Sequence, residues 1–224
     1  HLVQRLADIC ARRHARFVHI STDYVFGGQQ KREPLLELDA KAPLNVYGAS
    51  KAMGEELARM ANPDVLILRV ASLFGVAGAS GKGGNFVETV IRTGQMQGEL
   101  KVVADQLMSP TASADVATVL LKLVSDEVGR GIYHVVNSGA ASWYEFAIRI
   151  VERVGISVRV IPITSAEFPA RAKRPPYSVL SNKKVSGIVA PMRNWEEALD
   201  TYLLAKGYRT PRLSVSTWHA NAHF

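Results

Sequence analysis

Apolar and polar positions along this chain follow two periods, one typical of helices and one typical of buried strands. Apolar side chains recur at helical spacing over residues 2–10, and a short apolar run at 17–20 indicates a strand of a parallel sheet. Residues 46–60 predict a long helix that Asn62-Pro63 ends, before a second strand at 65–70. This order of elements predicts an α/β fold with a doubly wound parallel sheet.

The second half of the chain continues the same alternation. Ser142 and Glu145 have the spacing of a capping box at the start of a helix. We expect the helix at 114–125 and the strand at 132–136 to pack back onto the first sheet. Further helices are predicted at 85–94, 143–154 and 195–204, further strands at 100–104 and 158–163, and an extended basic loop at 169–176.

The most informative polar pair is Tyr47 with Lys51, which lie four residues apart in the helix predicted at 46–60. Residues at this spacing share one face of a helix, so the ammonium group can act on the phenol. A free phenol has a pKa of about 10 and exchanges protons slowly near neutrality, whereas a nearby cation favours its ionised form. The pair therefore suits protonation of a carbonyl oxygen while hydride arrives at the carbon. Taken alone, the spacing is also that of a half-buried Tyr beside a surface Lys.

Two small hydroxyl side chains stand near this pair in the predicted fold. Ser21 and Thr22 follow the strand at 17–20, and the carboxyl ends of parallel strands are where open α/β sheets bind ligands. Either hydroxyl could hydrogen-bond the carbonyl oxygen that Tyr47 protonates. A turn or a helix cap is the alternative role for the same residues.

Several motifs in order resemble those of one enzyme family. The first are Ser21-Thr22-Asp23-Tyr24-Val25-Phe26 and Pro43 to Lys51. The others are Leu68-Arg69, Phe74-Gly75, Asn85-Phe86-Val87, Val103 to Thr111, Gly131 to Gly139, Ser142 to Ala147, Arg174-Pro175, Ser178-Val179-Leu180 and Lys183. Together they resemble the dTDP-4-dehydrorhamnose reductases, which are extended short-chain dehydrogenase/reductases, over roughly residues 1–204. The resemblance implies a Rossmann-like sheet with a smaller α/β substrate domain.

The resemblance also implies an activity and a set of site residues. It implies reduction of dTDP-4-dehydro-L-rhamnose to dTDP-L-rhamnose by NADPH or NADH, with a dTDP-sugar as the substrate. The implied catalytic residues are Thr22, Tyr47 and Lys51, and Ser21 would join Tyr47 and Lys51 in binding the cofactor. The residues implied to bind the substrate are Tyr24, Asn85, Gln106, Ser109 and Arg174. A homodimer and a Mg²⁺ requirement of the full-length protein stay open.

The resemblance assigns the chain to two regions and indicates a missing one. Residues 1–73, with 114–138 returning to them, would form the C-terminal half of the dinucleotide-binding domain, and residues 74–113 and 139–224 the substrate-binding region. The family's opening strand, Gly-rich turn and helix do not occur here, so we expect part of a longer protein. The chain alone is then expected to aggregate and to bind nicotinamide cofactor poorly.

Composition narrows the function classes further. The net charge of +7 suits a nucleotide diphosphate, while the scattered basic residues include no long run or motif typical of nucleic-acid binding. The single cysteine, Cys10, excludes an intramolecular disulfide and is expected to be a small buried side chain in an apolar helical stripe. Neither a membrane span nor a metal site is indicated, and a cytoplasmic location is the default.

Three alternatives remain at this stage. Another NAD(P)-dependent nucleotide-sugar reductase or epimerase would share Tyr47, Lys51 and the fold. A non-catalytic relative, such as the regulatory subunit of methionine adenosyltransferase, would look similar and act by binding a partner. The glycines of residues 75–81 could form a phosphate-binding turn, although regular helix is expected only from about Asn85. Leu73 stands where many relatives have Trp, which leaves the exact sugar open.

Overall fold

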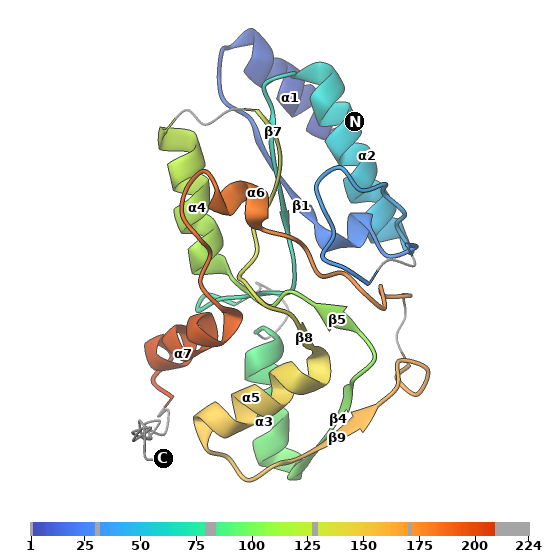
Figure 1. Ribbon diagram of the computed structural model, residues 1–224, viewed down its shortest axis with the longest axis vertical. Helices are drawn as coiled ribbons and strands as arrows, with labels where there is room; N and C mark the ends of the chain where they lie inside the picture. The colour runs from blue at the N-terminus through green and yellow to red at the C-terminus, as the bar shows by residue number, and fades with distance from the viewer. Residues whose placement is uncertain (1, 30–31, 79–83, 127–129, 170–171, 209–224) are drawn as a thin grey trace, which may run out of the picture.

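The structure is a computed structural model that describes residues 2–29, 32–78, 84–126, 130–169 and 172–208. Two lobes lie one above the other in Figure 1, with the parallel sheet in the upper lobe. The sheet has the order β1-β2-β7 and consists of β1 (Val18–Thr22), β2 (Leu66–Val70) and β7 (Gly131–His134). All pairings are parallel, which confirms the α/β class and the Rossmann-like arrangement.

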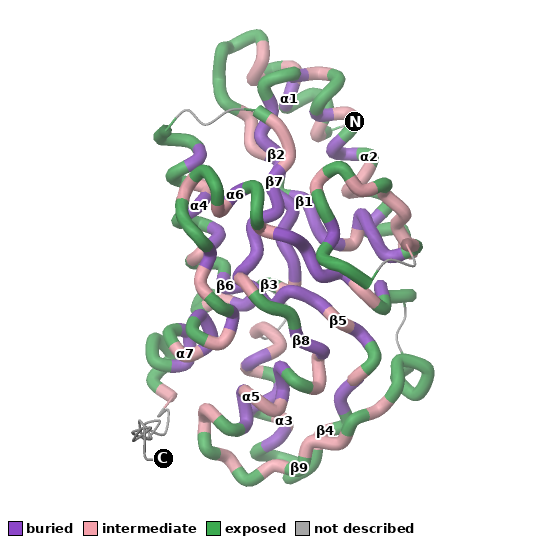
Figure 2. The backbone as a smooth tube through the Cα atoms, viewed as in Figure 1, coloured by how far each residue is buried: buried purple, intermediate pink, exposed green. Residues whose placement is uncertain are grey.

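Helices cover both faces of this sheet. On one face, α1 (Leu2–Arg12) and α2 (Val46–Ala61) pack through small side chains such as Ala7 and Ala58 against Ile67. On the other face, α4 (Ser113–Ser125) and the short α6 (Lys183–Ser186) bury Val119, Leu123 and Val185 against β2 and β7. Every residue of β2 is buried, as expected for a central parallel strand with helices on both sides (Figure 2).

The lower lobe has its own core. Its helices are α3 (Phe86–Gln97), α5 (Trp143–Val154) and α7 (Trp195–Ala205), and its strands β4 (Glu99–Val103) and β9 (Arg159–Ile163) pair in parallel. Phe74, Phe146 and Trp195 meet at the centre of this core. The capping box of Ser142 and Glu145 is confirmed, because both of its hydrogen bonds are formed at the start of α5.

Four two-residue strands connect the lobes and were not predicted. β3 (Leu73–Phe74) pairs in parallel with β6 (Thr111–Ala112), and β5 (Leu107–Met108) pairs antiparallel with β8 (Ala141–Ser142). The division of the chain into domains stays a prediction. Segments on both sides of residue 138 pack on the upper sheet, since Leu180 and Val185 from the C-terminal part join its core clusters.

The first helix departs from its expected orientation. α1 forms where the periodicity predicts a helix, but Leu2 is 71% exposed, Leu6 43% and Ile9 49%, while Ala7 is the residue that it buries. Leu2, Leu6 and Ile9 of the apolar stripe therefore face outward, whereas Val3 packs on the core cluster that contains Ala7. Cys10 is only half-buried, so the prediction that it is a buried core residue was wrong.

Candidate active site

The predicted Tyr/Lys helix begins beside the end of β1. Asn45 caps α2 by accepting a hydrogen bond from the Gly48 amide at 2.8 Å, and its own amide donates to the Lys173 carbonyl at 2.9 Å. A Cβ added at Gly48 would lie 2.1 Å from the Tyr24 carbonyl oxygen, so only glycine lets the helix approach so closely. Tyr47 is thereby held next to the turn that follows β1, with its ring edge-on to Tyr24 at 6.0 Å between centroids.

Lys51 lies one helical turn after Tyr47 and reaches the same strand end. Its Nζ donates to the Ile20 carbonyl at 2.5 Å, on the residue just before Ser21 and Thr22. Partial burial lowers the pKa of Lys51, and the charge of Glu55 opposes that shift. Tyr47 remains 54% exposed, so its phenol is open to a ligand. Both side chains thus come to the Ser-Thr turn from one face of α2, as their spacing predicts.

Thr22 ends β1 and caps a short 3₁₀ turn, η1 (Asp23–Val25). Its Oγ1 accepts a hydrogen bond from the Tyr24 amide at 3.2 Å and donates to Oδ1 of Asp23 at 3.0 Å. The alternative role of a cap is therefore real for Thr22, alongside its position at the sheet edge. Burial raises the pKa of Asp23 to about 6, against the opposing effect of the neighbouring Ser178 and Thr22 hydroxyls.

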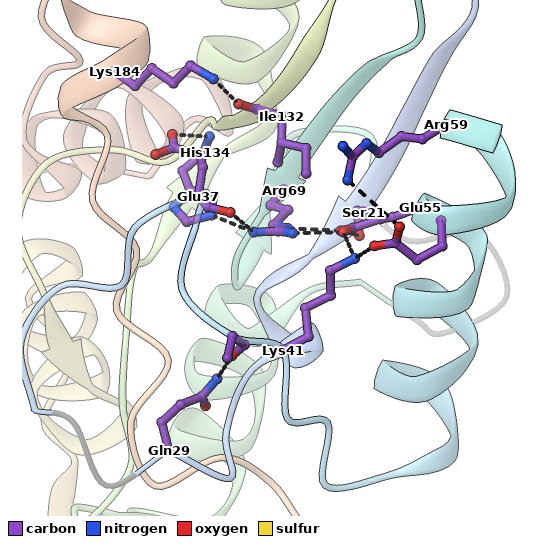
Figure 3. A network of polar contacts seen from close by, with 12 residues as sticks. Ser21, Gln29, Glu37, Lys41, Glu55, Arg59, Arg69, Ile132, His134 and Lys184 are labelled. Carbon is purple, nitrogen blue, oxygen red and sulfur yellow. Dashed lines mark hydrogen bonds and ion pairs between the residues drawn. The ribbon is translucent and has the colours of Figure 1, made fainter. Parts of the chain in front are cut away.

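A buried ion pair fixes α2 to the sheet one helical turn after Lys51 (Figure 3). Glu55 receives two hydrogen bonds from Arg69 of β2, Nε to Oε1 at 2.9 Å and Nη2 to Oε2 at 2.8 Å. The Ser21 hydroxyl donates to Oε1 at 2.5 Å, and Lys41 lies 2.9 Å from Oε2. Burial acts to raise the pKa of Glu55, but Arg69, Lys41 and Ser21 outweigh it and lower the pKa to about 2.

The same arginine extends the network to the third strand. Its Nη1 donates to the Glu37 carbonyl at 3.1 Å and faces Nε2 of His134 at 3.3 Å, while Nδ1 of His134 meets the Leu35 carbonyl at 3.1 Å. Burial, and then the positive charge of Arg69, lower the pKa of His134 to about 3, so this imidazole is neutral. The long loop between η1 and α2 thus contacts β2 through Glu37 and Arg69, and β7 through Leu35 and His134. Arg69 is connected to β1 in turn through Glu55 and Ser21.

Sequence reasoning missed the Glu55 network, although one signal was available. Tyr47, Lys51 and Glu55 follow at four-residue intervals, which continues the reactive face of the helix by one more turn. Ser21 was expected to contact a cofactor. In the structure its hydroxyl hydrogen is donated to Glu55, which holds α2 on β1, and its contact with a cofactor stays a prediction.

The residues expected to bind substrate fall into two groups. Arg174 acts electrostatically on the Tyr24 phenol, and the Tyr24 ring lies edge-on to Tyr47. Gln106 is buried next to Leu107, whose amide donates to the Pro176 carbonyl in the segment that carries Arg174.

The second group, Asn85 and Ser109, makes hydrogen bonds to other parts of the protein. Asn85 caps α3 and donates to the Gly75 carbonyl at 3.0 Å and to the Tyr202 hydroxyl at 3.1 Å. Ser109 is fully buried and its hydroxyl accepts from the Leu180 amide at 3.1 Å. Both side chains therefore shape the region between the lobes through protein contacts.

A nicotinamide ribose fits the exposed Tyr47 and the adjoining Lys51, since ribose hydroxyls can accept hydrogen bonds from the Lys51 ammonium and can donate to or accept from the Tyr47 phenol. The glycines of residues 75–81 are a poor phosphate cradle. Gly78 closes a turn onto the Gly75 carbonyl, and α3 begins only at Phe86; residues 79–83 lie outside the described part. No cluster of metal-binding side chains occurs among the described residues, and no helix there is long and apolar enough to cross a bilayer.

Known proteins share both the sequence and the architecture. The family described as the RmlD substrate binding domain matches residues 1–207. The spore coat polysaccharide biosynthesis protein SpsK of Bacillus subtilis is 43% identical over 189 residues, which are 84% of this chain and 64% of that protein. The dTDP-4-dehydrorhamnose reductase of Mycolicibacterium smegmatis is 39% identical over 202 residues, 89% of this chain and 61% of that protein.

A solved structure extends the likeness to three dimensions. The crystal structure of a dTDP-4-dehydrorhamnose reductase from Bacillus anthracis in complex with NADP has 37% sequence identity and a TM-score of 0.84, over 91% of this chain and 70% of that one. The chain spans 64% and 61% of the lengths of the two curated relatives. The match over residues 1–207 and the shared motifs confirm the resemblance: the chain belongs to the RmlD substrate binding domain family, that of the dTDP-4-dehydrorhamnose reductases.

Proposed function

We propose that the protein containing this chain reduces the 4-keto group of dTDP-4-dehydro-L-rhamnose to give dTDP-L-rhamnose, with NADPH or NADH as reductant. The observation that carries the proposal is the convergence of Tyr47, Lys51 and Thr22 at the carboxyl end of β1. An open α/β sheet binds its ligands at this edge.

Each of these residues has a role that follows from its position. NADPH or NADH, when bound, supplies the hydride for the sugar C4. Tyr47 donates its phenolic proton to the oxygen on C4 as negative charge develops there. Lys51 stabilises the phenolate that remains and hydrogen-bonds the ribose hydroxyls of the cofactor. Thr22 is proposed to donate a hydrogen bond to the same oxygen and so to orient the carbonyl.

Substrate recognition is proposed to come from the segment around Arg174 and from η1. Arg174 is exposed near Tyr24 and can pair with a phosphate of the dTDP group through two parallel hydrogen bonds. Tyr24 can pack on the sugar, since its ring already forms one side of the Tyr47 contact. Gln106 is proposed to contact the substrate from the segment next to Arg174. Asn85 and Ser109 shape the site by holding α3 and the 178–181 segment.

The proposal is tested with a fusion protein. This chain is joined to the part of the Mycolicibacterium smegmatis reductase that the match does not cover, and NADPH or NADH oxidation is followed with dTDP-4-dehydro-L-rhamnose. We expect oxidation coupled to formation of dTDP-L-rhamnose, with deuterium from C4-labelled nicotinamide appearing at C4 of the sugar. Absence of turnover in a folded fusion that binds the cofactor contradicts the proposal.

The sugar itself can be resolved in the same assay. SpsK carries a different name from the reductases, and Leu73 is exposed at the start of β3. A series of dTDP-4-keto-6-deoxyhexoses that differ at C3 and C5 should rank the L-rhamnose precursor first. A higher kcat/KM for another member of the series would reassign the substrate within the 4-keto reductases.

A further inference from the structure

The Thr22 hydroxyl has a single hydrogen, and the structure directs it inward. Oγ1 accepts from the Tyr24 amide at 3.2 Å and lies 3.0 Å from Oδ1 of Asp23. An ionised carboxylate can only accept hydrogen bonds, so the hydrogen between the two oxygens must come from Thr22. In this state Thr22 has no hydrogen to offer to a substrate oxygen, which conflicts with its proposed role as a donor.

The surroundings of Asp23 favour its protonated form, which would resolve this conflict. Its side chain is buried in η1, and none of the contributors to its pKa is a charged group. The segment after Pro176 contributes the Ser178 hydroxyl, and its own turn contributes Thr22 and the Tyr24 amide. Tyr47 of α2 and Arg174 shift the pKa of the Tyr24 phenol, as does the charge of Asp23 itself, and neither is among the causes of the Asp23 shift. Burial without a cation raises its pKa to about 6.

Protonation of Asp23 on Oδ1 reverses the hydrogen bond to Thr22; the other carboxyl oxygen, Oδ2, is buried without a hydrogen-bond partner, so a proton there would have no acceptor. The carboxyl O–H then donates to Oγ1, whose two acceptor positions are filled by Asp23 and by the Tyr24 amide. The hydroxyl hydrogen of Thr22 then has no remaining acceptor inside the turn and is free to bond to a bound substrate.

We propose that Asp23 is a positioning residue whose proton determines whether the Thr22 hydroxyl donates into the protein or to the substrate carbonyl. The inference rests on the proposed function and refines it. Asp23 takes its proton from solvent and keeps it through the turnover. The hydride still comes from the nicotinamide and the proton of the product from Tyr47, so the balance of the reaction is unchanged.

The first experiment uses the 224-residue chain itself and needs no turnover. The ¹³C-labelled threonine methyl groups are followed by NMR between pH 5 and 8, and the Thr22 signal is assigned by its loss in Thr22→Val. We expect the Thr22 signal to titrate with a midpoint near pH 6, and to be constant in Asp23→Asn, where the amide donates to Oγ1 at all pH values. A Thr22 signal that does not move in the parent chain overturns the proposal.

Two further variants test whether the Thr22 titration reports on Asp23 and not on an unrelated change of charge. Ser178→Ala removes a contact that lowers the pKa of Asp23, so the midpoint should move to higher pH. Asp126→Asn makes the same change of charge at the exposed end of α4 and should leave the Thr22 titration unaltered. If Asp126→Asn abolishes the titration, or Ser178→Ala leaves its midpoint in place, the Asp23 assignment is wrong.

The second experiment measures kcat in the fusion protein. We expect kcat to fall about 10-fold per pH unit above about 6, until the reaction without the Thr22 hydrogen bond dominates, because the neutral fraction of Asp23 falls at that rate. KM should change little. Asp23→Asn should remove this fall of kcat with pH. Thr22→Val should also remove it, with a kcat that is low at every pH. An Asp23→Asn variant whose kcat falls with pH as in the parent overturns the inference, whereas a fusion without turnover contradicts the proposed function and leaves the NMR titration to decide on Asp23.

Discussion

At the scale of single residues, the site depends on how closely α2 approaches the end of β1. Gly48 makes this approach possible, since its Cα lies against the Tyr24 carbonyl with no room for a side chain. Tyr47 precedes it directly and takes its position from the same contact. The chemistry of the Tyr/Lys pair therefore depends on a neighbour that carries no reactive group.

Gly48→Ala should displace the first turn of α2. The new methyl group would overlap the Tyr24 oxygen at 2.1 Å, so we expect a loss of about 1–3 kcal/mol in the free energy of unfolding, measured in urea. Gly187→Ala is the matched control, because its Cβ would meet the nearest atoms at 3.6 Å, an ordinary contact. Equal stability of the two variants would show that α2 has room to move.

The residues foreseen from the sequence and those missed differ in one physical respect. Tyr47, Lys51 and Thr22 could be predicted because local spacing and a strand end place them. Glu55 and Asp23 could not, since a carboxylate in a helix or a turn is normally solvated, and their burial depends on Arg69 and Ser178 from distant segments.

At the scale of elements, long helices and central strands followed from periodicity, whereas the short connecting strands did not. β3, β5, β6 and β8 have two residues each, too few for a periodic pattern, and their partners are remote in the sequence. The orientation of α1 was also missed, because an apolar stripe indicates a covered face but not what covers it. A buried ion pair, Glu55 with Arg69, joins α2 to the sheet in addition to its apolar packing.

Arg69→Met should be strongly destabilising. It leaves the Glu55 carboxylate buried with Lys41 as its remaining charged partner, and breaking a buried pair typically costs about 3–5 kcal/mol in the free energy of unfolding. The double variant Arg69→Met with Glu55→Met removes both charges and should recover much of the loss.

The control is an ion pair of the same type on the surface. Arg130 and Asp64 are exposed and 3.3 Å apart, so Arg130→Met should change stability by less than about 1 kcal/mol. A double variant at Glu55 and Arg69 that is no more stable than Arg69→Met alone would argue against an uncompensated charge as the cause.

At the scale of the whole molecule, the described chain exposes an apolar face and a strand edge together. Leu2, Leu6 and Ile9 project from α1, and β1 forms the outer edge of the sheet, paired on one side with β2. An unpaired edge beside exposed apolar side chains is a typical site of association. The family relationship and the site are thus readable in this chain, while its behaviour in solution depends on this face.

We expect the 224-residue chain to self-associate with increasing concentration. Leu6→Lys should shift it toward monomer in light scattering after size exclusion, because the charge would have to be buried in the associated state. Val124→Lys places the same charge on partly exposed α4 and should leave the association unchanged. A chain that stays monomeric at all concentrations and binds NADPH stoichiometrically would contradict this expectation.

The most direct measurement of the central claim is the kinetics of Tyr47→Phe in the fusion protein. Removing one hydroxyl from an exposed side chain leaves the fold and the substrate contacts in place, so KM should change little. The loss of general acid catalysis should lower kcat by about 10²–10⁴-fold. A kcat equal to that of the parent would show that another group protonates the sugar oxygen, and the proposed role of the Tyr47–Lys51 pair would be wrong.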